Sequence, residues 1–275
     1  MTDLAPKASL VATEQLAALD GSIAPLEETL IPVSDEGFTR GDGVFEVIRV
    51  YDGRPFALGQ HLDRLERSAA NLRLGWPVPR AELEREAAEL LHARGGAEWD
   101  GCLRIVLTRG RRRLLVTEPL PPTVARARLG FVTYAPTRVL DGVKSLSYAP
   151  NMLCGRLARE RGFDEALLVT PHGRVLEAPT SSLFWVTPDG LLCTPPLEDH
   201  ILASITRALV MRLVPVVERP ATTDDVLEAR EAFLCSTTRE VQPVAAIEGH
   251  ELPPEGPLST AAATALRAHI EAQLR

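Results

Sequence analysis

The sequence is poor in lysine. Of the 30 basic residues in the 275-residue chain only Lys7 and Lys144 are lysines, and all the others are arginines. A guanidinium stays protonated at any working pH, whereas a desolvated lysine amine can lose its proton and attack a carbonyl carbon. Lys144, within residues 142–146, is therefore a candidate for a lysine that forms a Schiff base. A surface lysine is the alternative, and composition alone does not separate the two.

An excess of positive charge is also missing. The formal net charge is -7, which excludes the long-range attraction that nucleic acids or anionic membranes exert on a basic face. No apolar stretch approaches the roughly 20 residues of a membrane helix, and no signal-peptide pattern opens the chain. We expect a cytoplasmic protein with a small-molecule ligand. The basic run Arg109–Arg113 has two readings, a phosphate or carboxylate contact and a solvated loop.

Cysteine and histidine are few and scattered. The cysteines lack CxxC spacing and the histidines lack paired spacing, so the sequence predicts neither a disulfide framework nor a metal site. We read the cysteines as small buried hydrophobic residues and the histidines as surface or locally bonded groups. These residues are Cys102, Cys154, Cys193, Cys235, His61, His92, His172, His200, His250 and His269.

The first half of the chain predicts a mixed α+β domain. Residues 1–24 are interpreted as an arm with a short helix around 13–18. Two β-branched or aromatic runs flank Asp52-Gly53, a favoured two-residue turn, and predict a hairpin over 44–58. Apolar periodicity and alternation predict two helices and two strands. The helices cover 61–74 and 80–94, and the strands cover 103–108 and 128–134.

A proline and an Asp-Gly pair between 134 and 142 mark a change of pattern. We therefore predict a smaller N-terminal domain over 1–137 and a larger C-terminal domain over 138–275, which carries Lys144. Turn residues separate the expected elements of the second half. Helices are expected at 150–161, 204–213, 223–230 and 260–274, and extended segments at 165–170, 174–177, 182–186, 191–194, 232–235 and 243–247.

A lysine that forms an imine suggests pyridoxal phosphate, which needs a phosphate anchor and an acid facing its pyridine nitrogen. Glu177 ends an apolar strand, and a carboxylate there would stabilise a protonated ring nitrogen. For the phosphate, residues 203–207 lie where a loop turns into a helix, and residues 235–240 offer hydroxyls and loop amides after a strand. A solvent-facing glutamate, a helix cap and ordinary turn chemistry are the alternatives.

The order of these segments resembles a known family. The likeness is carried by residues 37–49, 61–65, 143–146, 163–168, 173–184, 194–196, 205–207 and 236–243, and it covers the chain from about residue 25 to 250. These segments resemble the fold-type IV pyridoxal-phosphate enzymes, which include branched-chain and D-amino acid aminotransferases and aminodeoxychorismate lyase. The resemblance implies a two-domain α/β (α+β) architecture with pyridoxal 5'-phosphate at the domain interface, and a homodimer.

The resemblance also implies roles for single residues. Lys144 matches the lysine that holds the cofactor and moves the substrate proton, and Glu177 matches the partner of the pyridine nitrogen. Arg64 matches an arginine that reaches the phosphate from the first domain. The other implied phosphate ligands are Ile205, Thr206 and Thr237.

The resemblance implies that substrate recognition depends on a few side chains of the first domain and, in the homodimer, of the neighbouring subunit. Phe38 and Arg40 stand where relatives present aromatic residues, and Arg40 is either a trap for a substrate carboxylate or a solvent-facing residue. Thr238 and Arg239 are further candidates, although an ion pair of Arg239 with Glu240 is the simpler reading.

The subclass signals are mixed. The Arg-x-His trap of D-amino acid enzymes is absent at Arg111–Arg113, and the Asn-Tyr pair of branched-chain enzymes is absent near Tyr148. The run Gly41–Val47 is closer to the D-amino acid and lyase branches. The sequence thus predicts an aminotransferase acting on an α-amino acid and an α-keto acid, with the D-amino acid branch favoured. The alternative is aminodeoxychorismate lyase, which releases pyruvate and p-aminobenzoate.

Overall fold

The computed structural model describes residues 15–254 and 256–275. The chain divides between Leu120 and Pro121 into two compact units, called here the first unit and the second unit. The boundary that the sequence predicts, between 137 and 138, is C-terminal to this division in the structure. The difference arises at β7 (Ala127–Thr133), which pairs in parallel with β8 (Glu165–Val169) and β15 (Glu240–Ile247) and so belongs to the second unit.

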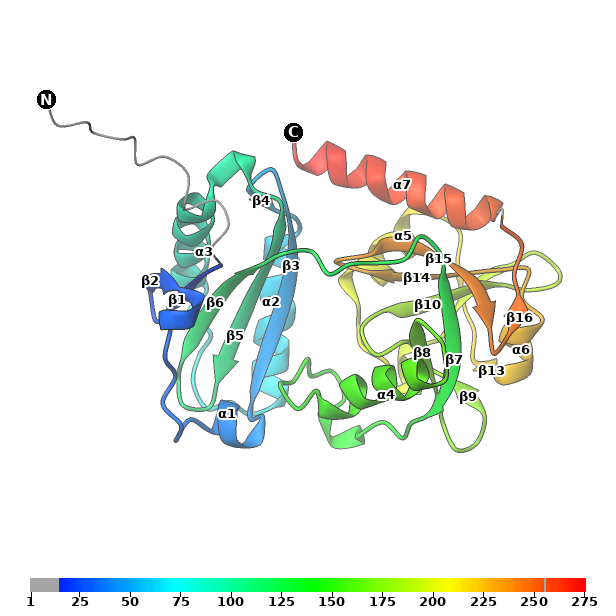
Figure 1. Ribbon diagram of the computed structural model, residues 1–275, viewed down its shortest axis with the longest axis horizontal. Coiled ribbons are helices and arrows are strands. Elements are labelled where there is room, and N and C mark those ends of the chain that lie inside the picture. Colours follow the sequence, from blue (N-terminus) through cyan, green and yellow to red (C-terminus); the bar gives the residue numbers. More distant parts are fainter. Residues whose placement is uncertain (1–14, 255) are drawn as a thin grey trace, which may run out of the picture. The chain divides into compact units, whose positions relative to one another are not determined.

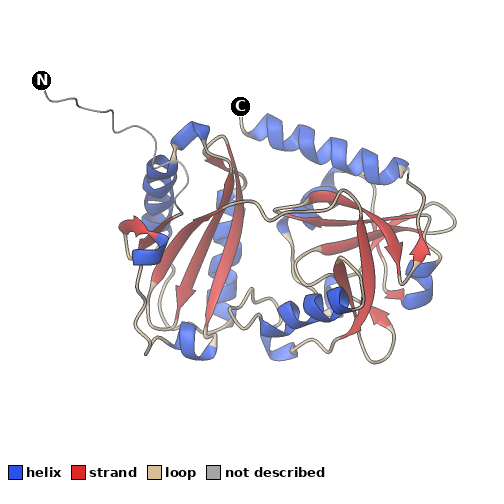
Figure 2. Ribbon diagram, in the orientation of Figure 1, coloured by secondary structure: helices blue, strands red, loops and turns tan. Residues whose placement is uncertain are grey.

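The first unit is built on an antiparallel sheet of six strands in the order β2-β1-β6-β5-β3-β4. Its helices lie beside this sheet in Figures 1 and 2. In chain order the elements are β1 (Leu16–Leu19), β2 (Ser22–Pro25), η1 (Leu26–Glu28), α1 (Glu36–Arg40), β3 (Gly43–Tyr51), β4 (Arg54–Pro55), α2 (Leu58–Asn71), α3 (Arg80–Arg94), η2 (Gly96–Glu98), β5 (Gly101–Thr108) and β6 (Arg113–Glu118).

The predicted hairpin and both predicted helices of this unit are confirmed. Asp52 and Gly53 have φ values of 46° and 70°, the left-handed pair that a tight hairpin turn between β3 and β4 requires. Helix α2 buries Leu62, Leu65 and Ala69 on one face and packs against β3. Helix α3 packs against β6 and β1.

The interpretation of the N-terminal segment needs a correction. Residues 1–14 lie outside the described residues, but Leu16–Leu19 forms strand β1 and not a helix. This strand pairs with β2 through the turn at Asp20-Gly21 and with β6 on its other side. Long-range pairing with β6 overrides the local helix signal, so this part of the expected arm belongs to the sheet.

The second unit contains ten paired strands, nine of them in the order β12-β11-β10-β14-β15-β7-β8-β9-β13, with β16 beside β15. Helix α4 packs on β7 and β8, while α5 and α7 pack on each other and on β14 (Figure 1). Its remaining elements are η3 (Arg138–Leu140), α4 (Ala149–Glu160), β9 (Arg174–Val175), β10 (Ser182–Val186), β11 (Leu192–Thr194), η4 (Leu197–Asp199), α5 (Ile205–Leu213), β12 (Val217–Glu218), β13 (Ala221–Thr222), α6 (Thr223–Leu227), β14 (Glu231–Ser236), β16 (His250–Glu251) and α7 (Pro257–Gln273).

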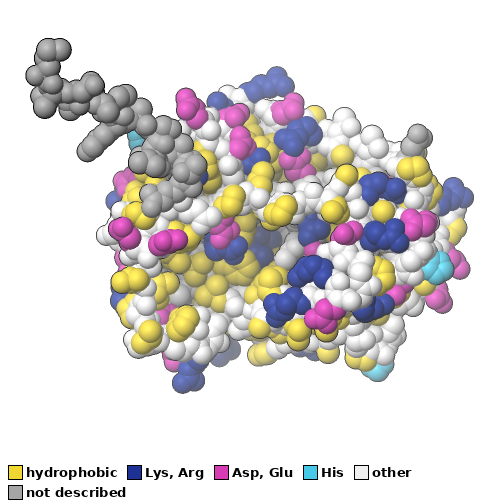
Figure 3. Space-filling model, viewed as in Figure 1, with side chains coloured by type: hydrophobic (Ala, Val, Ile, Leu, Met, Phe, Trp, Pro, Cys, Tyr) yellow, Lys and Arg dark blue, Asp and Glu magenta, His cyan; other side chains and the backbone are white. Residues whose placement is uncertain are grey.

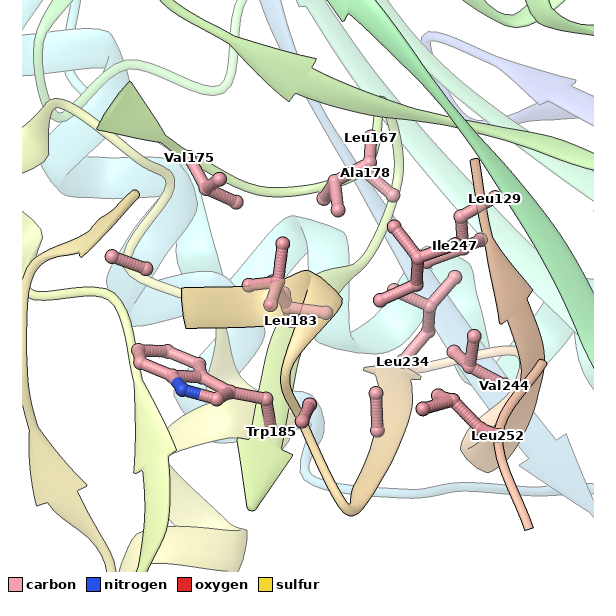
Figure 4. Close-up of a cluster of buried hydrophobic side chains, with 14 of the residues drawn as sticks. Leu129, Leu167, Val175, Ala178, Leu183, Trp185, Leu234, Val244, Ile247 and Leu252 are labelled. Atoms are coloured by element: carbon pink, nitrogen blue, oxygen red, sulfur yellow. The ribbon is translucent and has the colours of Figure 1, made fainter. Parts of the chain in front are cut away.

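One buried apolar cluster holds the strands of this unit together. Figure 4 shows Leu183 and Trp185 of β10 in this cluster with Leu234 of β14, and all three side chains are fully buried. Leu129 of β7 and Leu167 of β8 complete it from the parallel part of the sheet. The cluster packs the strands of this unit against one another. The mixed α and β architecture agrees with the predicted fold class.

Candidate active site

Lys144 lies in the loop between η3 and α4 and is half-buried. Its Nζ stands 5.6 Å from the centroid of the Tyr148 ring. The Tyr148 hydroxyl donates a hydrogen bond of 2.7 Å to the carbonyl oxygen of Pro179, and Asn151 Nδ2 donates to the same oxygen at 3.0 Å. Two side chains at the start of α4 therefore hold the lysine loop against the turn that follows Glu177.

Glu177 links that turn to the segment before α5. Its backbone carbonyl accepts a hydrogen bond of 2.9 Å from Leu168 of β8, and its carboxylate Oε1 accepts one of 2.9 Å from the amide of Leu202. The side chain is half-buried. Burial raises the pKa of Tyr134, and the negative charge of Glu177 nearby adds to that rise. A carboxylate held in this way can accept a charge-assisted hydrogen bond from a protonated ring nitrogen.

The start of α5 offers backbone amides to an anion. Ser204 caps the helix, and its hydroxyl accepts a hydrogen bond of 3.2 Å from the amide of Arg207. Ile205 and Thr206 are the first two residues of the helix, so their amides have no acceptor within it. The helix dipole also favours negative charge at this end. The amide of Leu202, just before the helix, donates a hydrogen bond to the Glu177 carboxylate. The helix start therefore lies close to that carboxylate.

The turn between β14 and β15 carries the second hydroxyl group. The Ser236 hydroxyl accepts a hydrogen bond of 3.3 Å from the amide of Arg239, and this closes the turn around Thr237 and Thr238. Both threonines are half-buried. Thr237 therefore stands on a loop whose shape is set by a neighbouring side chain and not by its own hydroxyl.

Strand register brings these loops to one end of the sheet. Ser182 of β10 pairs with Cys235 of β14, so the turn at 178–181 and the turn at 237–239 leave the sheet side by side. Helix α5 packs on β14 at the same unit. The second unit thus gathers an amine, a carboxylate, helix-start amides and a hydroxyl around the segment 177–182. The members predicted from sequence are Lys144, Glu177, Ile205, Thr206 and Thr237.

Arg239 does not pair as the simpler sequence reading expected. Its Nη1 donates a hydrogen bond of 2.7 Å to Gln242 Oε1, and its Nη2 forms an ion pair with Glu165. Glu240 is instead paired with Arg267 of α7. The expected Arg239–Glu240 pair is wrong because each side chain pairs with a residue distant in the chain, Arg239 with Glu165 and Glu240 with Arg267.

Arg64, in the first unit, is buried and belongs to a charged cluster. Glu46 Oε1 accepts a hydrogen bond of 2.7 Å from its Nε, and Glu46 Oε2 accepts one of 2.6 Å from its Nη2. His61 Nδ1 lies 2.7 Å from the same Oε2. Burial alone would raise the pKa of Glu46, but hydrogen bonds from Arg64 and His61 outweigh it and lower the pKa to about 2.

Glu46 was missed as a partner of Arg64 at the sequence level. The available signal was an acidic residue in the middle of the apolar strand β3, together with His61 and Arg64 three residues apart on one helix face. A buried carboxylate needs such cationic or donor partners. His61 is accordingly a buried, bonded residue of the first unit.

Phe38 and Arg40 lie on the short helix α1 and are exposed. Phe38 is 73% exposed, and Arg40 forms a 3.6 Å contact with Glu36. The helix is anchored by Asp35, whose carboxylate accepts hydrogen bonds of 2.7 Å from Gly37 N and 2.8 Å from the Thr108 hydroxyl. This anchor fixes the backbone that presents Phe38 and Arg40, and their substrate roles stay predictions.

Three arginines of the basic run have partners within the first unit, and its contact with a ligand stays a prediction. Arg109 pairs with Asp42 and also donates to the carbonyl oxygens of Leu72, Arg73 and Leu74 at the end of α2, at 3.0 to 3.4 Å. Arg112 and Arg113 pair with acidic partners far away in the chain, Asp20 and Glu86. Figure 3 likewise shows basic and acidic side chains interspersed over the visible face. These arginines hold the first unit together.

Neither a metal site nor a membrane span is found among the described residues. Within residues 15–254 and 256–275, no group of three or more His, Cys, Asp or Glu side chains could hold a metal ion. In the same ranges, no helix is long and apolar enough to cross a membrane. The four cysteines are buried and free, as their sequence context predicts.

The chain is similar in sequence to known proteins over most of its length. A family model described as "Amino-transferase class IV" matches residues 43–247. A Methanocaldococcus jannaschii protein named "Putative branched-chain-amino-acid aminotransferase" is 34% identical over 254 residues, which cover 84% of this chain and 87% of that protein. The D-alanine aminotransferase of Bacillus licheniformis is 32% identical over 274 residues, covering 91% and 95%.

The fold is also similar to that of solved structures. A hypothetical aminotransferase from Mycobacterium tuberculosis, in its PLP-bound form, superposes with a TM-score of 0.84 at 26% sequence identity. The match covers 94% of this chain and 99% of that one. Sequence and structure therefore agree on one family over nearly the whole chain.

Proposed function

The chain belongs to the class IV aminotransferases, and from this premise we propose that it moves an amino group between an α-amino acid and an α-keto acid with pyridoxal 5'-phosphate bound at Lys144. The observation that carries the proposal is the position of Lys144. It is the single lysine of the described residues, and Tyr148 and Asn151 hold its loop against the turn after Glu177. The amine, the carboxylate and the anion site of the second unit fit the aldehyde, the ring nitrogen and the phosphate of the cofactor, respectively.

Each group has a defined task in this proposal. When bound, the cofactor supplies an electron sink that makes the substrate α-proton acidic. The Nζ of Lys144 would hold the cofactor, and its amine would be the base that takes the substrate α-proton and the acid that gives the proton back to the acceptor carbon. The carboxylate of Glu177 keeps a proton on the pyridine nitrogen by a charge-assisted hydrogen bond.

The phosphate is assigned to the start of α5 and the β14–β15 turn. The amides of Ile205 and Thr206 and the hydroxyls of Thr206 and Thr237 would donate to it, with support from the helix dipole. Arg64 is a further proposed ligand on the strength of the family resemblance. Its guanidinium is oriented by Glu46, which takes two of its donors.

The substrates proposed are α-amino and α-keto acids, with the D-amino acid branch favoured by the run Gly41–Val47. The two relatives described above are named for branched-chain and for D-alanine substrates, so they support the general class more than one member of it. Both relatives are named as aminotransferases, which favours amino-group transfer over the elimination catalysed by aminodeoxychorismate lyase. A homodimer in the cytoplasm is proposed from the same family resemblance.

The experiment is an absorption spectrum of the purified protein followed by a scan of D- and L-amino acids without any acceptor. A cofactor band that amino acids convert to the pyridoxamine form supports transamination, and the donors that do so identify the enantiomer. Release of pyruvate and p-aminobenzoate from aminodeoxychorismate without a keto acid would instead establish the lyase. A protein that takes up no pyridoxal phosphate would refute the proposal.

A further inference from the structure

A pocket of about 370 Å³ lies in the second unit, and Arg239 is the one candidate residue named above that lines it. It is formed by the segment before β7, the end of α4 with the loop that follows it, and the start of β15. Lys144, Glu177, Thr206 and Thr237 are not among its lining residues. Its volume is within the range of small-molecule pockets, roughly 300–1,000 Å³.

The floor of the pocket is held in place by hydrogen bonds. Gln242 is a lining residue whose Nε2 donates at 2.6 Å to the carbonyl oxygen of Val124 and whose Oε1 accepts at 2.7 Å from Arg239. Arg239 is further tied to Glu165. These partners use both ends of the Gln242 amide, so the floor is formed before any ligand arrives.

Two opposite charges on the pocket wall are not paired with each other. Arg159 is an exposed residue near the end of α4, and within the described residues its guanidinium has no hydrogen bond and no ion pair. Asp164 follows α4, and its Oδ2 accepts a hydrogen bond of 2.8 Å from the amide of Arg128. This bond orients the carboxylate and leaves its other oxygen for a second donor.

Apolar groups complete the lining. Val124 and Phe163 line the same pocket as the two charged side chains and add hydrocarbon surface to it. The pocket therefore presents the cation of Arg159, the anion of Asp164 and an apolar wall, besides Arg239, which is paired with Glu165. A ligand that satisfies all three carries a carboxylate, an ammonium group and an apolar side chain.

We propose that this pocket binds an apolar α-amino acid as a second site, with its carboxylate on Arg159 and its ammonium group on Asp164. The site is additional to the one at Lys144, and its binding does not depend on transamination. The ligand would also contact the floor at Arg239, whose amide closes the turn that carries Thr237. Occupancy of the pocket would thus stiffen a loop of the proposed cofactor site.

The test is calorimetric titration of the protein as purified with cofactor, using α-methyl-L-leucine and, separately, α-methyl-D-leucine. These amino acids lack an α-proton, so they cannot be transaminated. Binding at Lys144 changes the cofactor absorption, whereas binding in the pocket produces heat without that change. We expect a binding event of the second kind, and Arg159→Gln or Asp164→Asn should weaken it about tenfold or more.

The matched control is Arg156→Gln, which removes an exposed arginine of α4 that does not line the pocket. It should leave the titration unchanged. The keto acid 4-methyl-2-oxopentanoate, which lacks the ammonium group, should bind the pocket more weakly and be insensitive to Asp164→Asn. Titration curves of Arg159→Gln that superpose on the wild type, or heat that always follows the cofactor spectrum, would overturn the second site. Absence of a cofactor band would refute the proposed function and leave this binding measurable.

Discussion

Two glutamates, one in each unit, show how the protein uses carboxylates differently. Glu46 is fully buried, and Arg64 and His61 bind its oxygens. Glu177 is half-buried beside the loop of Lys144, and its carboxylate accepts a hydrogen bond from the backbone amide of Leu202. The first carboxylate is enclosed with its counter-charge and stabilises a fold. The second is accessible and can act on a ligand, so similar sequence settings have different consequences.

The largest effect is expected at the lysine. Lys144→Ala removes the amine that holds the cofactor and moves the α-proton, so transamination should fall by about 10³-fold or more. Steady-state rates with an amino acid and a keto acid measure this. Lys7→Arg is the matched control because it changes the other lysine of the chain. An alanine variant that keeps more than a tenth of the activity would show that Lys144 is not the catalytic amine.

The next largest effect is a loss of stability, expected when the buried Glu46 is replaced. Glu46→Ala leaves Arg64 buried without its carboxylate, which should lower the free energy of unfolding by about 3–5 kcal/mol. Chemical denaturation measures the change. As a control, Glu118→Ala breaks an ion pair with Arg104 whose side chains are 30% and 33% exposed, and it should cost less than about 1 kcal/mol. Equal losses of unfolding free energy in the two variants would show that burial does not distinguish the Glu46–Arg64 pair from the Glu118–Arg104 pair.

The pH dependence of stability tests the charge of Glu46 in the same cluster. The pKa of Glu46 is lowered from an ordinary 4.5 to about 2. A lowered carboxyl pKa contributes stability above pH 4.5, about 3 kcal/mol here, and this is lost as the pH falls toward 2. The difference in unfolding free energy between the wild type and Glu46→Gln should therefore shrink below pH 4.5. A difference that stays constant across this window would contradict the assignment.

A smaller effect is expected for the accessible carboxylate. Glu177→Gln keeps an oxygen for the amide of Leu202 but removes the charge that would hold a proton on the ring nitrogen. We predict a loss in kcat of about 10- to 100-fold with retained cofactor. Stability should change by less than in Glu46→Ala, because Glu177 is partly solvated. A kcat equal to that of the wild type would exclude Glu177 from the chemistry.

The smallest effect concerns the cap of α5. Ser204→Ala removes the hydroxyl that accepts from the amide of Arg207, which should cost about 1 kcal/mol of stability. Because the cap fixes the helix start that carries Ile205 and Thr206, affinity for pyridoxal phosphate should weaken several-fold as well. Fluorescence titration of the apoprotein measures the affinity. Unchanged affinity together with lower stability would assign Ser204 a purely structural role.

Local signals were enough to predict much of the fold. The Asp52-Gly53 turn and the apolar face of α2 depend on residues near each other in the chain, and both are present. The loop of Lys144 and the strand end at Glu177 could be recognised because their motifs are short and lie in a fixed order. Their approach through Tyr148 and Pro179 depends on tertiary contact and could not be predicted.

Long-range partners account for what was missed. The ion pairs of the basic run before β6 could not be predicted, because its acidic partners, Asp20 and Glu86, are distant in sequence. The local helix signal at β1 misleads for the same reason, since the neighbouring strand β6 lies about a hundred residues away. Glu46 could be seen as an acidic residue in a buried strand, but its pairing with Arg64 required the packed structure.

The most direct test of the central claim is to locate the covalently held cofactor. The protein purified with pyridoxal phosphate is reduced with borohydride, which fixes the cofactor to the amine that holds it, and its peptides are then analysed by mass spectrometry. The account predicts the added mass of the reduced cofactor on Lys144 alone. Cofactor found on Lys7, or a protein that carries none after loading, would contradict it.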